Sequence, residues 1–344
     1  MRTITLNPPN TGVAVENLSG EPLGQDRMYL RCNFPLPSSA PGGFEVVVPG
    51  SDVRFVKPED LQTLERVERE VVLECAGNGR TLMSPVPEGT PWDLDAVSPI
   101  SIAGYRLADL VGDLPAEVVE VVFTGADAGV VEPEGRVPYQ FSISRDLATS
   151  PLPLLVTHIG GEPLDLAHGA PVRLIVPGHY AMNSVKWLVR VEAVTAPFDG
   201  HFVKKYRYYG DDWESEQAPV ADLAVRSMIS TPRDGDVVPS GALEIRGSAW
   251  AGSGVASVEV SADGGETWVE GDVEHRPDQP WAAVPWTVTV DAESGLLEIV
   301  VRATDSSGAT QPLEPRWNAN GYANNVLHRV MVHVEEPQIE TEVV

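Results

Sequence analysis

The chain has 344 residues, of which 42% are hydrophobic, and its 50 acidic residues outnumber 24 basic ones to give a formal net charge of -26. This length fits two domains with packed cores, and the apolar content argues against disorder. The negative charge disfavours nucleic acid and anionic membrane surfaces as partners. The sequence has no apolar run of about 18 residues and no leader-like N-terminus, so we expect a cytoplasmic protein, or a periplasmic or secreted one if a leader was removed.

The first half of the chain predicts an α+β fold with many strands. Residues 1–45 read as irregular, and Pro58 followed by two acidic residues predicts the start of a short helix. An alternating pattern over 185–192 places the odd-numbered apolar residues on one face of a strand. Buried strands are predicted over 71–73, 118–123 and 172–176.

From about residue 220 the sequence predicts only β-structure. Asp263-Gly264-Gly265 is a hairpin turn signal, and short strands with turns at regular spacing are typical of an immunoglobulin-like β-sandwich. Gln217-Ala218-Pro219 reads as a linker, which gives predicted domains 1–218 and 219–344. The predicted strands span 243–245, 257–260, 287–290, 296–304 and 326–334.

Leu73-Glu74-Cys75-Ala76-Gly77-Asn78-Gly79-Arg80 is the most informative segment. It predicts a buried strand that delivers Cys75 into a loop, whose glycines let the backbone approach a ligand. The nearby Arg80 favours the thiolate, which is a soft metal donor. The alternative interpretation is a structural cysteine before a tight turn. The second cysteine, Cys32, leaves open one disulfide or two free thiols.

At this point the chain resembles the sulfite oxidase family of molybdopterin oxidoreductases. The Cys75 segment is similar to the family's molybdenum-ligand motif, and further family-like segments follow in the family's order over nearly the whole chain. These segments are Arg31-Cys32-Asn33-Phe34-Pro35, Pro91-Trp92, Phe123-Thr124-Gly125-Ala126-Asp127, His168-Gly169-Ala170-Pro171-Val172-Arg173, Ser184-Val185-Lys186-Trp187 and a dimerisation-domain-like region from Thr231 to Val334.

The resemblance implies a molybdopterin-binding domain followed by an immunoglobulin-like dimerisation domain, and therefore a homodimer. Cys75 would bind molybdenum beside one molybdopterin, and Tyr206 and Arg31 would act in catalysis. Arg80, Trp92 and Asn320 would bind the substrate, a small oxyanion or sulfur compound. The residues implied to hold the cofactor are Arg31, Cys32, Asn33, Asp127, His168, Arg173, Ser184, Val185 and Lys186.

Departures from the family pattern affect the expected substrate and electron path. Asn320 stands where the family has an arginine, which weakens the expected grip on a dianion. Gly79 and Cys32 also differ from the animal enzymes, and two interpretations of Cys32 stay open: a position near the metal or simple packing. No Cys-x-x-Cys-His motif is present, so we expect no haem and an external acceptor, of the cytochrome c type or dioxygen.

The sequence therefore predicts oxygen-atom transfer, with oxidation of sulfite or a related sulfur compound as the first choice. One alternative is reduction of nitrate or a sulfoxide at the same site. A second is an immunoglobulin-like binding protein without metal. A third is a thiol enzyme in which Cys75 acts as a nucleophile with a histidine partner.

Overall fold

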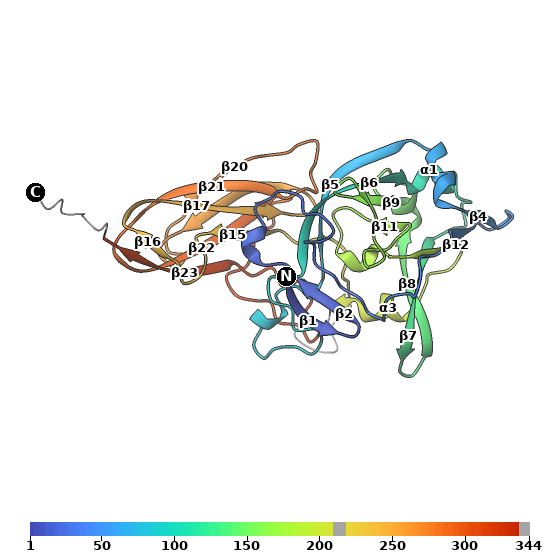
Figure 1. Cartoon of the computed structure of the whole chain (residues 1–344), viewed down its shortest axis with the longest axis horizontal. Helices are drawn as coiled ribbons and strands as arrows, with labels where there is room; N and C mark the ends of the chain where they lie inside the picture. The colour runs from blue at the N-terminus through green and yellow to red at the C-terminus, as the bar shows by residue number, and fades with distance from the viewer. Residues whose placement is uncertain (209–217, 337–344) are drawn as a thin grey trace, which may run out of the picture. The chain divides into compact units, whose positions relative to one another are not determined.

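The computed structural model describes residues 1–208 and 218–336, and it divides into two compact units (Figure 1). The chain passes from the first unit to the second at Leu223, close to the predicted boundary. The units are not continuous in sequence, because residues 14–21 belong to the second unit and residues 317–324 belong to the first. Unit 1 comprises Met1–Val13, Pro22–Leu223 and Trp317–Asn324, and unit 2 comprises Ala14–Glu21, Ala224–Arg316 and Asn325–Val344.

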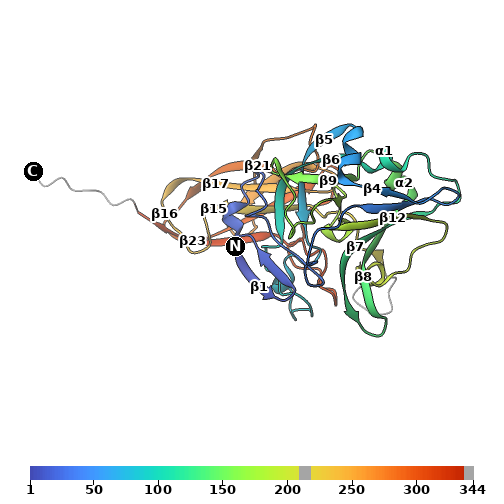
Figure 2. The same ribbon diagram turned by 45° about the vertical axis from the view of Figure 1, so that its right-hand side comes forward.

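Unit 1 is built mainly from two five-stranded sheets. One has the order β10-β9-β6-β5, with β11 paired to β9, and the other has the order β4-β3-β12-β7-β8, which can be followed in Figure 2. The strands of the first sheet are β5 (Arg66–Glu74), β6 (Val97–Arg106), β9 (Leu154–Ile159), β10 (Glu162–Pro163) and β11 (Arg173–Ile175). Those of the second are β3 (Phe44–Val47), β4 (Arg54–Val56), β7 (Glu120–Val131), β8 (Gly135–Ser144) and β12 (Leu188–Val194).

The described helices of unit 1 are short, as expected from the many Pro and Gly residues. The helix predicted at Pro58 is a 3-10 turn whose Leu61 is buried, and the Asp60 carboxylate accepts the backbone N–H of Lys57 at 2.9 Å. The α-helices are α1 (Leu107–Val111), α2 (Arg145–Thr149) and α3 (His201–Lys205). The 3-10 turns are Val15–Asn17, which lies in unit 2, and Pro58–Thr63, Arg80–Leu82 and Ala181–Asn183.

Two predictions for this half are wrong in detail. Residues 1–45 are not wholly irregular, because β1 (Arg2–Leu6) and β2 (Pro9–Gly12) form an antiparallel hairpin. The alternating strand predicted over 185–192 begins only at Leu188, since Trp187 adopts a left-handed backbone with φ of 51°. The pairing of β12 with β7 is irregular between Leu188 and Arg190, which breaks the expected alternation. A small sheet of β13 (Arg207–Tyr208) and β14 (Ala218–Pro219) completes unit 1.

Unit 2 is the predicted β-sandwich. Its sheets have the orders β15-β17-β21-β20 and β16-β23-β22-β18-β19. The first contains β15 (Arg226–Thr231), β17 (Gly241–Trp250), β20 (Asp272–Val273) and β21 (Val284–Ala292). The second contains β16 (Val237–Pro239), β18 (Val255–Ser261), β19 (Val269–Glu270), β22 (Gly295–Asp305) and β23 (His328–Glu335).

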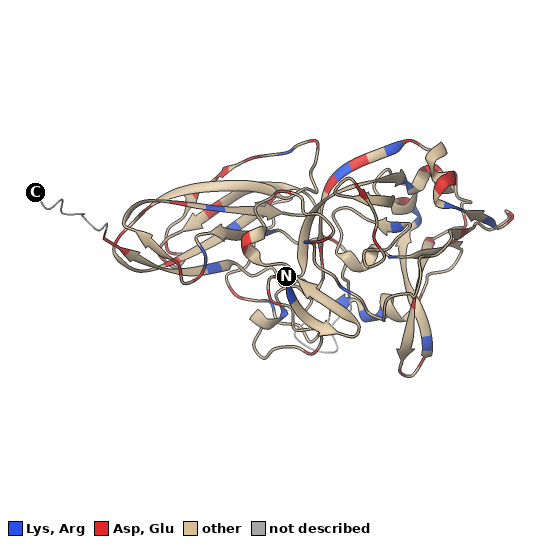
Figure 3. Cartoon of the chain, viewed as in Figure 1, with Lys and Arg blue, Asp and Glu red and all other residues tan. Residues whose placement is uncertain are grey.

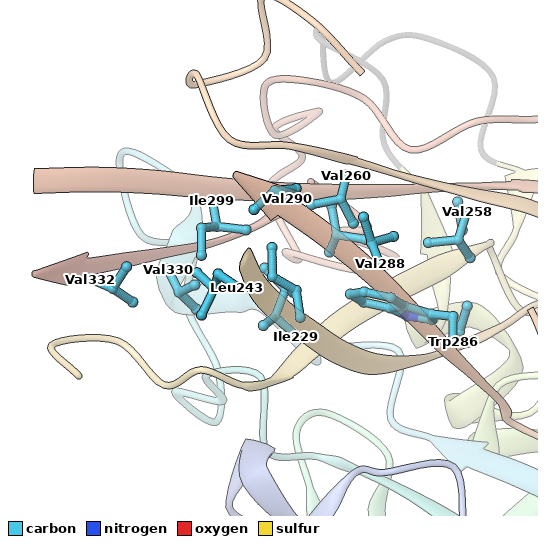
Figure 4. Close-up of a cluster of buried hydrophobic side chains, with 14 of the residues drawn as sticks. Ile229, Leu243, Val258, Val260, Trp286, Val288, Val290, Ile299, Val330 and Val332 are labelled. Atoms are coloured by element: carbon cyan, nitrogen blue, oxygen red, sulfur yellow. The ribbon is translucent and has the colours of Figure 1, made fainter. Parts of the chain in front are cut away.

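The core of the sandwich is aliphatic around one large aromatic side chain (Figure 4). Ile245 and Val288, on the neighbouring strands β17 and β21, face this core with Val260 and Val332 from the other sheet. The Trp286 indole lies so close to β17 that a Cβ at Gly247 would be 2.3 Å from it. The alternating burial along β21 and the first half of β17 is the pattern of a half-buried antiparallel sheet, whereas the last four residues of β17 are all buried.

Charged residues are spread along the strands and loops of both units, as the colours in Figure 3 show. Several of the basic residues are paired, as in the contact of Arg302 with Glu259 at 2.7 Å and that of Arg190 with Glu45 at 2.5 Å. In the described residues, no helix has both the length and the apolar character needed to cross a membrane.

Candidate active site

Cys75 lies at the end of β5, where the backbone turns sharply into a loop. Its N–H donates to the carbonyl of Ala96 at 2.9 Å, so it stays attached to the chain leading into β6. Asn78 fixes the turn, because its buried amide donates to the Glu74 carboxylate at 2.9 Å and accepts the N–H of Ala96 at 3.0 Å. Gly79 has a φ of 79°, which a side chain would disfavour. The sequence thus holds a half-buried thiol at a rigid position.

A cavity in unit 1 opens in front of Cys75. Ten of the residues predicted to form the site line it, and they come from segments far apart in the sequence. Both cysteines are free, so the alternative of a bridge between them is wrong. The predicted residues on the cavity wall are Arg31, Cys32, Asn33, Cys75, Asp127, His168, Arg173, Ser184, Lys186 and Tyr206.

One wall of the cavity is basic and incompletely paired. His168 is oriented by Asp165, whose carboxylate contacts Nδ1 at 2.9 Å, and its buried Nε2 has no partner within the described residues. The guanidinium of Arg173 donates to the carbonyls of His168 and Ser184 at 3.0 and 3.3 Å, while its buried Nε is also unpaired there. Burial lowers the pKa of Arg173 to about 10 and lowers that of His168, against the opposing effect of Asp165. The unpaired Nε–H of Arg173 is a buried donor that favours an anionic ligand, and Nε2 of His168 becomes a second donor when the ring is protonated.

Lys186 adds a second buried cation to the same wall. Its ammonium donates to the Ala167 carbonyl at 3.0 Å and to the Cys32 sulfur at 3.1 Å, and lies 4.2 Å from the centre of the Trp187 ring. Burial lowers the pKa of Lys186. The left-handed backbone of Trp187 turns the chain here, and its indole is anchored to the Leu166 carbonyl at 2.6 Å. Strain at such a position is typical of functional sites.

Asp127 reaches the cavity through a distortion of β7. The pairing of β7 with β8 is interrupted between Thr124 and Ala128, and such a bulge re-aims the side chains it contains. The Asp127 side chain is buried, and burial raises its pKa from 3.8 to about 6, although Lys186 acts in the opposite direction. Asp127 is thus an acceptor whose charge is only partly offset by protein groups.

Arg31, Asn33 and Tyr206 form a polar cluster on the cavity wall. The guanidinium of Arg31 donates to the Asn33 side chain at 2.8 Å and to the Cys32 carbonyl. Burial raises the pKa of Tyr206, and Arg31 opposes this rise. Burial by itself would lower the pKa of Arg31, but the electrostatic effects of Tyr206 and Cys75 outweigh burial. The pKa of Arg31 is therefore raised overall. Arg31 therefore stays charged and Tyr206 stays protonated, which leaves a cation and a hydroxyl donor beside the Cys75 thiol.

The three predicted substrate-binding residues do not line this cavity. Arg80 is buried and donates to the carbonyls of Asn320 and Thr90, at 2.9 and 2.5 Å, while the amide of Asn320 donates to the Arg207 carbonyl at 3.2 Å. Trp92 is fully buried and packs edge-on to Tyr29 with ring centres 6.4 Å apart. In this structure Trp92 therefore packs as a core residue.

Arg80 is nevertheless linked to the cavity through aromatic rings. Its guanidinium carbon lies 5.6 Å from the centre of the Tyr322 ring, which is 5.3 Å from that of Tyr206. Three glycines leave room for it, since a Cβ at Gly77, Gly89 or Gly321 would lie 2.6, 3.1 or 2.8 Å from its side chain. Gly77 of the Cys75 segment and the two glycines outside it thus make room for the Arg80 side chain.

The remaining predicted residue, Val185, is fully buried and does not line the cavity. Its carbonyl accepts the N–H of Leu174 at 2.8 Å, so it connects β11 to the loop that carries Ser184 and Lys186. Sequence reasoning missed Tyr29 and Tyr139, which line the cavity, and Tyr322, which packs on Tyr206. Tyr322 lies two residues after Asn320, but nothing in the sequence alone distinguishes it from a core aromatic.

Comparison with known proteins identifies the family. Residues 33–202 match the oxidoreductase molybdopterin binding domain, and residues 217–335 match the Mo-co oxidoreductase dimerisation domain. The chain is 34% identical to the mitochondrial sulfite oxidase of Homo sapiens over 361 residues, which cover 97% of this chain and 65% of that protein. It is 35% identical to the sulfite oxidase of Gallus gallus over 359 residues, covering 96% of this chain and 77% of that protein. The chain belongs to the sulfite oxidase family.

Two other known proteins are similar to this chain in sequence or in fold. A nitrate reductase of Hordeum vulgare is 31% identical over 353 residues, which cover 90% of this chain and 39% of that protein. The crystal structure of the sulfane dehydrogenase SoxCD from Paracoccus pantotrophus has the same fold, with a TM-score of 0.81 at 21% identity over 97% of this chain and 88% of that one. The chain spans 65% of the length of the human relative, slightly less than two thirds.

The residues of the cavity fit the molybdopterin cofactor of the sulfite oxidase family. The unpaired Nε–H of Arg173 and the buried charge of Lys186 suit an anionic phosphate, whose negative charge would in turn favour the protonated form of His168, in which Nε2 donates. Within the described chain, no group of three His, Cys, Asp or Glu residues is placed to hold a metal ion, so a metal at Cys75 would take its other ligands from the cofactor. The predicted binding-protein alternative without metal is wrong for a member of this family.

Proposed function

We propose that this protein is a molybdenum-dependent oxidoreductase that oxidises sulfite or a closely related sulfur oxyanion and passes the electrons to an external acceptor. The observation that carries the proposal is the combination of a half-buried Cys75 thiol, an unpaired basic wall for a phosphate, and Arg31 with Tyr206 beside the thiol. Its relatives of 34 and 35% identity are named sulfite oxidases.

The proposed roles follow from the chemistry of each side chain. Cys75 would ligate the metal, and His168, Arg173 and Lys186 would hold the cofactor's phosphate. Molybdenum bound with molybdopterin supplies two-electron oxygen-atom transfer. The protein's share would be orientation and charge: Arg31 attracts the oxyanion, and Tyr206, kept protonated because burial raises its pKa, donates a hydrogen bond to it.

The metal assignment is tested by measuring molybdenum in the wild type and in a Cys75→Ser variant, both made in a host that synthesises molybdopterin. We expect about one molybdenum per wild-type chain, with loss of the metal or a changed absorption spectrum in the variant. Sulfite-dependent reduction of ferricyanide should follow the metal content. An absence of molybdenum from the wild type, in a host that loads a control sulfite oxidase, would refute the proposal.

Reduction of nitrate at the same site is the second candidate, because a nitrate reductase is 31% identical to this chain. The neutral Asn320 favours this reading, since a singly charged anion needs fewer cations than a dianion does. Nitrate-dependent oxidation of reduced methyl viologen distinguishes the two. A kcat/KM for nitrate above that for sulfite would replace the first proposal with the second.

We also propose that the sandwich forms a homodimer, since residues 217–335 match a dimerisation domain. Light scattering after size-exclusion chromatography tests this. A mass of one chain at micromolar concentration would contradict it.

A further inference from the structure

Among the residues that the structure describes, three cations near the cavity have no carboxylate partner, although acidic residues outnumber basic ones twofold in the chain. Within the described part of the chain, Arg31, Arg80 and Lys205 form no ion pair. The two arginines donate hydrogen bonds to backbone carbonyls and to a side-chain amide oxygen. Several exposed arginines elsewhere are paired, such as Arg246 with Glu244. Cations left unpaired beside a cavity of so acidic a protein indicate an anion site.

Lys205 is positioned by the last turn of α3. Its ammonium lies 5.8 Å from the centre of the Phe202 ring, which is stacked on the Tyr206 ring with centres 6.5 Å apart. Phe202 also packs on Tyr139, another residue of the cavity wall, with ring centres 4.4 Å apart. The lysine stem thus follows an aromatic surface that continues into the cavity, with its charged end still reached by solvent.

The electrostatics agree with this placement. The pKa of Lys205 is lowered, first by burial and then by the charges of Arg31 and Arg80. Both guanidinium groups therefore act on the same ammonium, although Arg31 and Arg80 are held by different loops. Both Lys204 and Lys205 are exposed, but the neighbouring Lys204 pairs with Asp199 at 3.0 Å. The two adjacent lysines therefore differ in their partners: Lys204 contacts a carboxylate, whereas Lys205 lies over the Phe202 ring.

We infer that Lys205 completes the anion-binding site with Arg31 and Arg80, and that it supplies the positive charge that Asn320 does not. The Asn320 amide is neutral and is engaged with the Arg207 carbonyl, while its own carbonyl orients Arg80. In this proposal, the Asn320 carbonyl orients Arg80, and Lys205 contributes the positive charge. This inference rests on the proposed function in so far as the anion is the substrate.

The test compares Lys205→Gln with the matched control Lys204→Gln in molybdenum-loaded protein. We expect the KM for sulfite to rise about tenfold in K205Q with kcat within about twofold, and neither to change in K204Q. K205R should retain a KM near that of the wild type. Adding Asn320→Arg to K205Q should lower the KM again. Equal KM values for K205Q and K204Q, at equal molybdenum content and melting temperature, would overturn the inference.

A second readout separates this inference from the proposed function. Sulfate binding is measured by calorimetry on the same loaded proteins and requires no turnover. If the wild type does not oxidise sulfite, the proposed function fails, yet weaker sulfate binding by K205Q than by K204Q still supports the anion site. Equal sulfate binding by the two variants, or no sulfate binding by the wild type, overturns it.

Discussion

The buried carboxyl of Asp127 should make the stability of the cofactor-free protein fall as the pH rises. Its pKa is raised from 3.8 to about 6 in the folded protein, because burial disfavours the charge. Between these two pH values the folded chain binds the proton that the unfolded chain has released. The free energy of unfolding therefore decreases as the pH rises through this window.

The magnitude follows from the shift of about two pKa units. One unit corresponds to about 1.4 kcal/mol, so the ionised Asp127 costs the folded state up to about 3 kcal/mol above pH 6. The variant Asp127→Asn has a similar shape and no charge to bury. Cofactor-free D127N should therefore melt about 5 °C higher than the wild type at pH 7.5, with a much smaller difference at pH 4.5.

Calorimetric melting of both proteins, made in a host that lacks molybdopterin, measures this difference. Asp52→Asn is the control, because it removes the same charge from an exposed loop position. A D127N variant that is no more stable than the wild type at pH 7.5 would refute the reasoning. In a host that makes the cofactor, D127N should contain less molybdenum than the wild type, because it loses an acceptor proposed to bind the pterin.

Three further predictions concern the loops and the surface. Gly321→Ala should lower kcat/KM for sulfite about tenfold or more, because the φ of Gly321 is 61° and the new Cβ would lie 2.8 Å from the Arg80 side chain. An unchanged kcat/KM would show that Arg80 does not need this space. Ala323→Gly should leave the melting temperature unchanged or raise it slightly, because Ala323 already has a φ of 52°, and a marked drop in calorimetry would contradict this. The rate with a basic cytochrome c should fall as salt is added, whereas the rate with ferricyanide should not, given the net charge of -26; equal salt dependence would argue against steering by the acidic surface.

The pattern of apolar residues in the sequence predicted where the strands lie better than it predicted where each strand begins and ends. The apolar run before Cys75 is part of β5, and the run at 118–123 falls mostly within β7. The distortion of β7 before Ala128 and the left-handed backbone at Trp187 left no trace in the alternation pattern. Both distortions arise from tertiary packing, which local propensity does not contain.

The candidate site was predictable where its residues form contiguous motifs. The Cys75 loop and the segment of Ser184 and Lys186 each carry a local signature, and both line the cavity. Lys205 and Tyr322 carry none, because their placement depends on which chain segments pack beside Tyr206. The roles of all these residues stay predictions until the variants are measured.

The return of residues 317–324 to the first unit has a consequence for biogenesis. Arg80 takes its carbonyl acceptor from Asn320, a residue 240 positions later in the chain. On the ribosome, the strands from β15 to β22 are therefore translated before that acceptor exists. The residues that line the cavity, by contrast, all lie between Met28 and Tyr206. Contacts between such distant residues form late in folding. A nascent chain can thus complete its cofactor pocket well before it fixes the arginine proposed to meet the substrate.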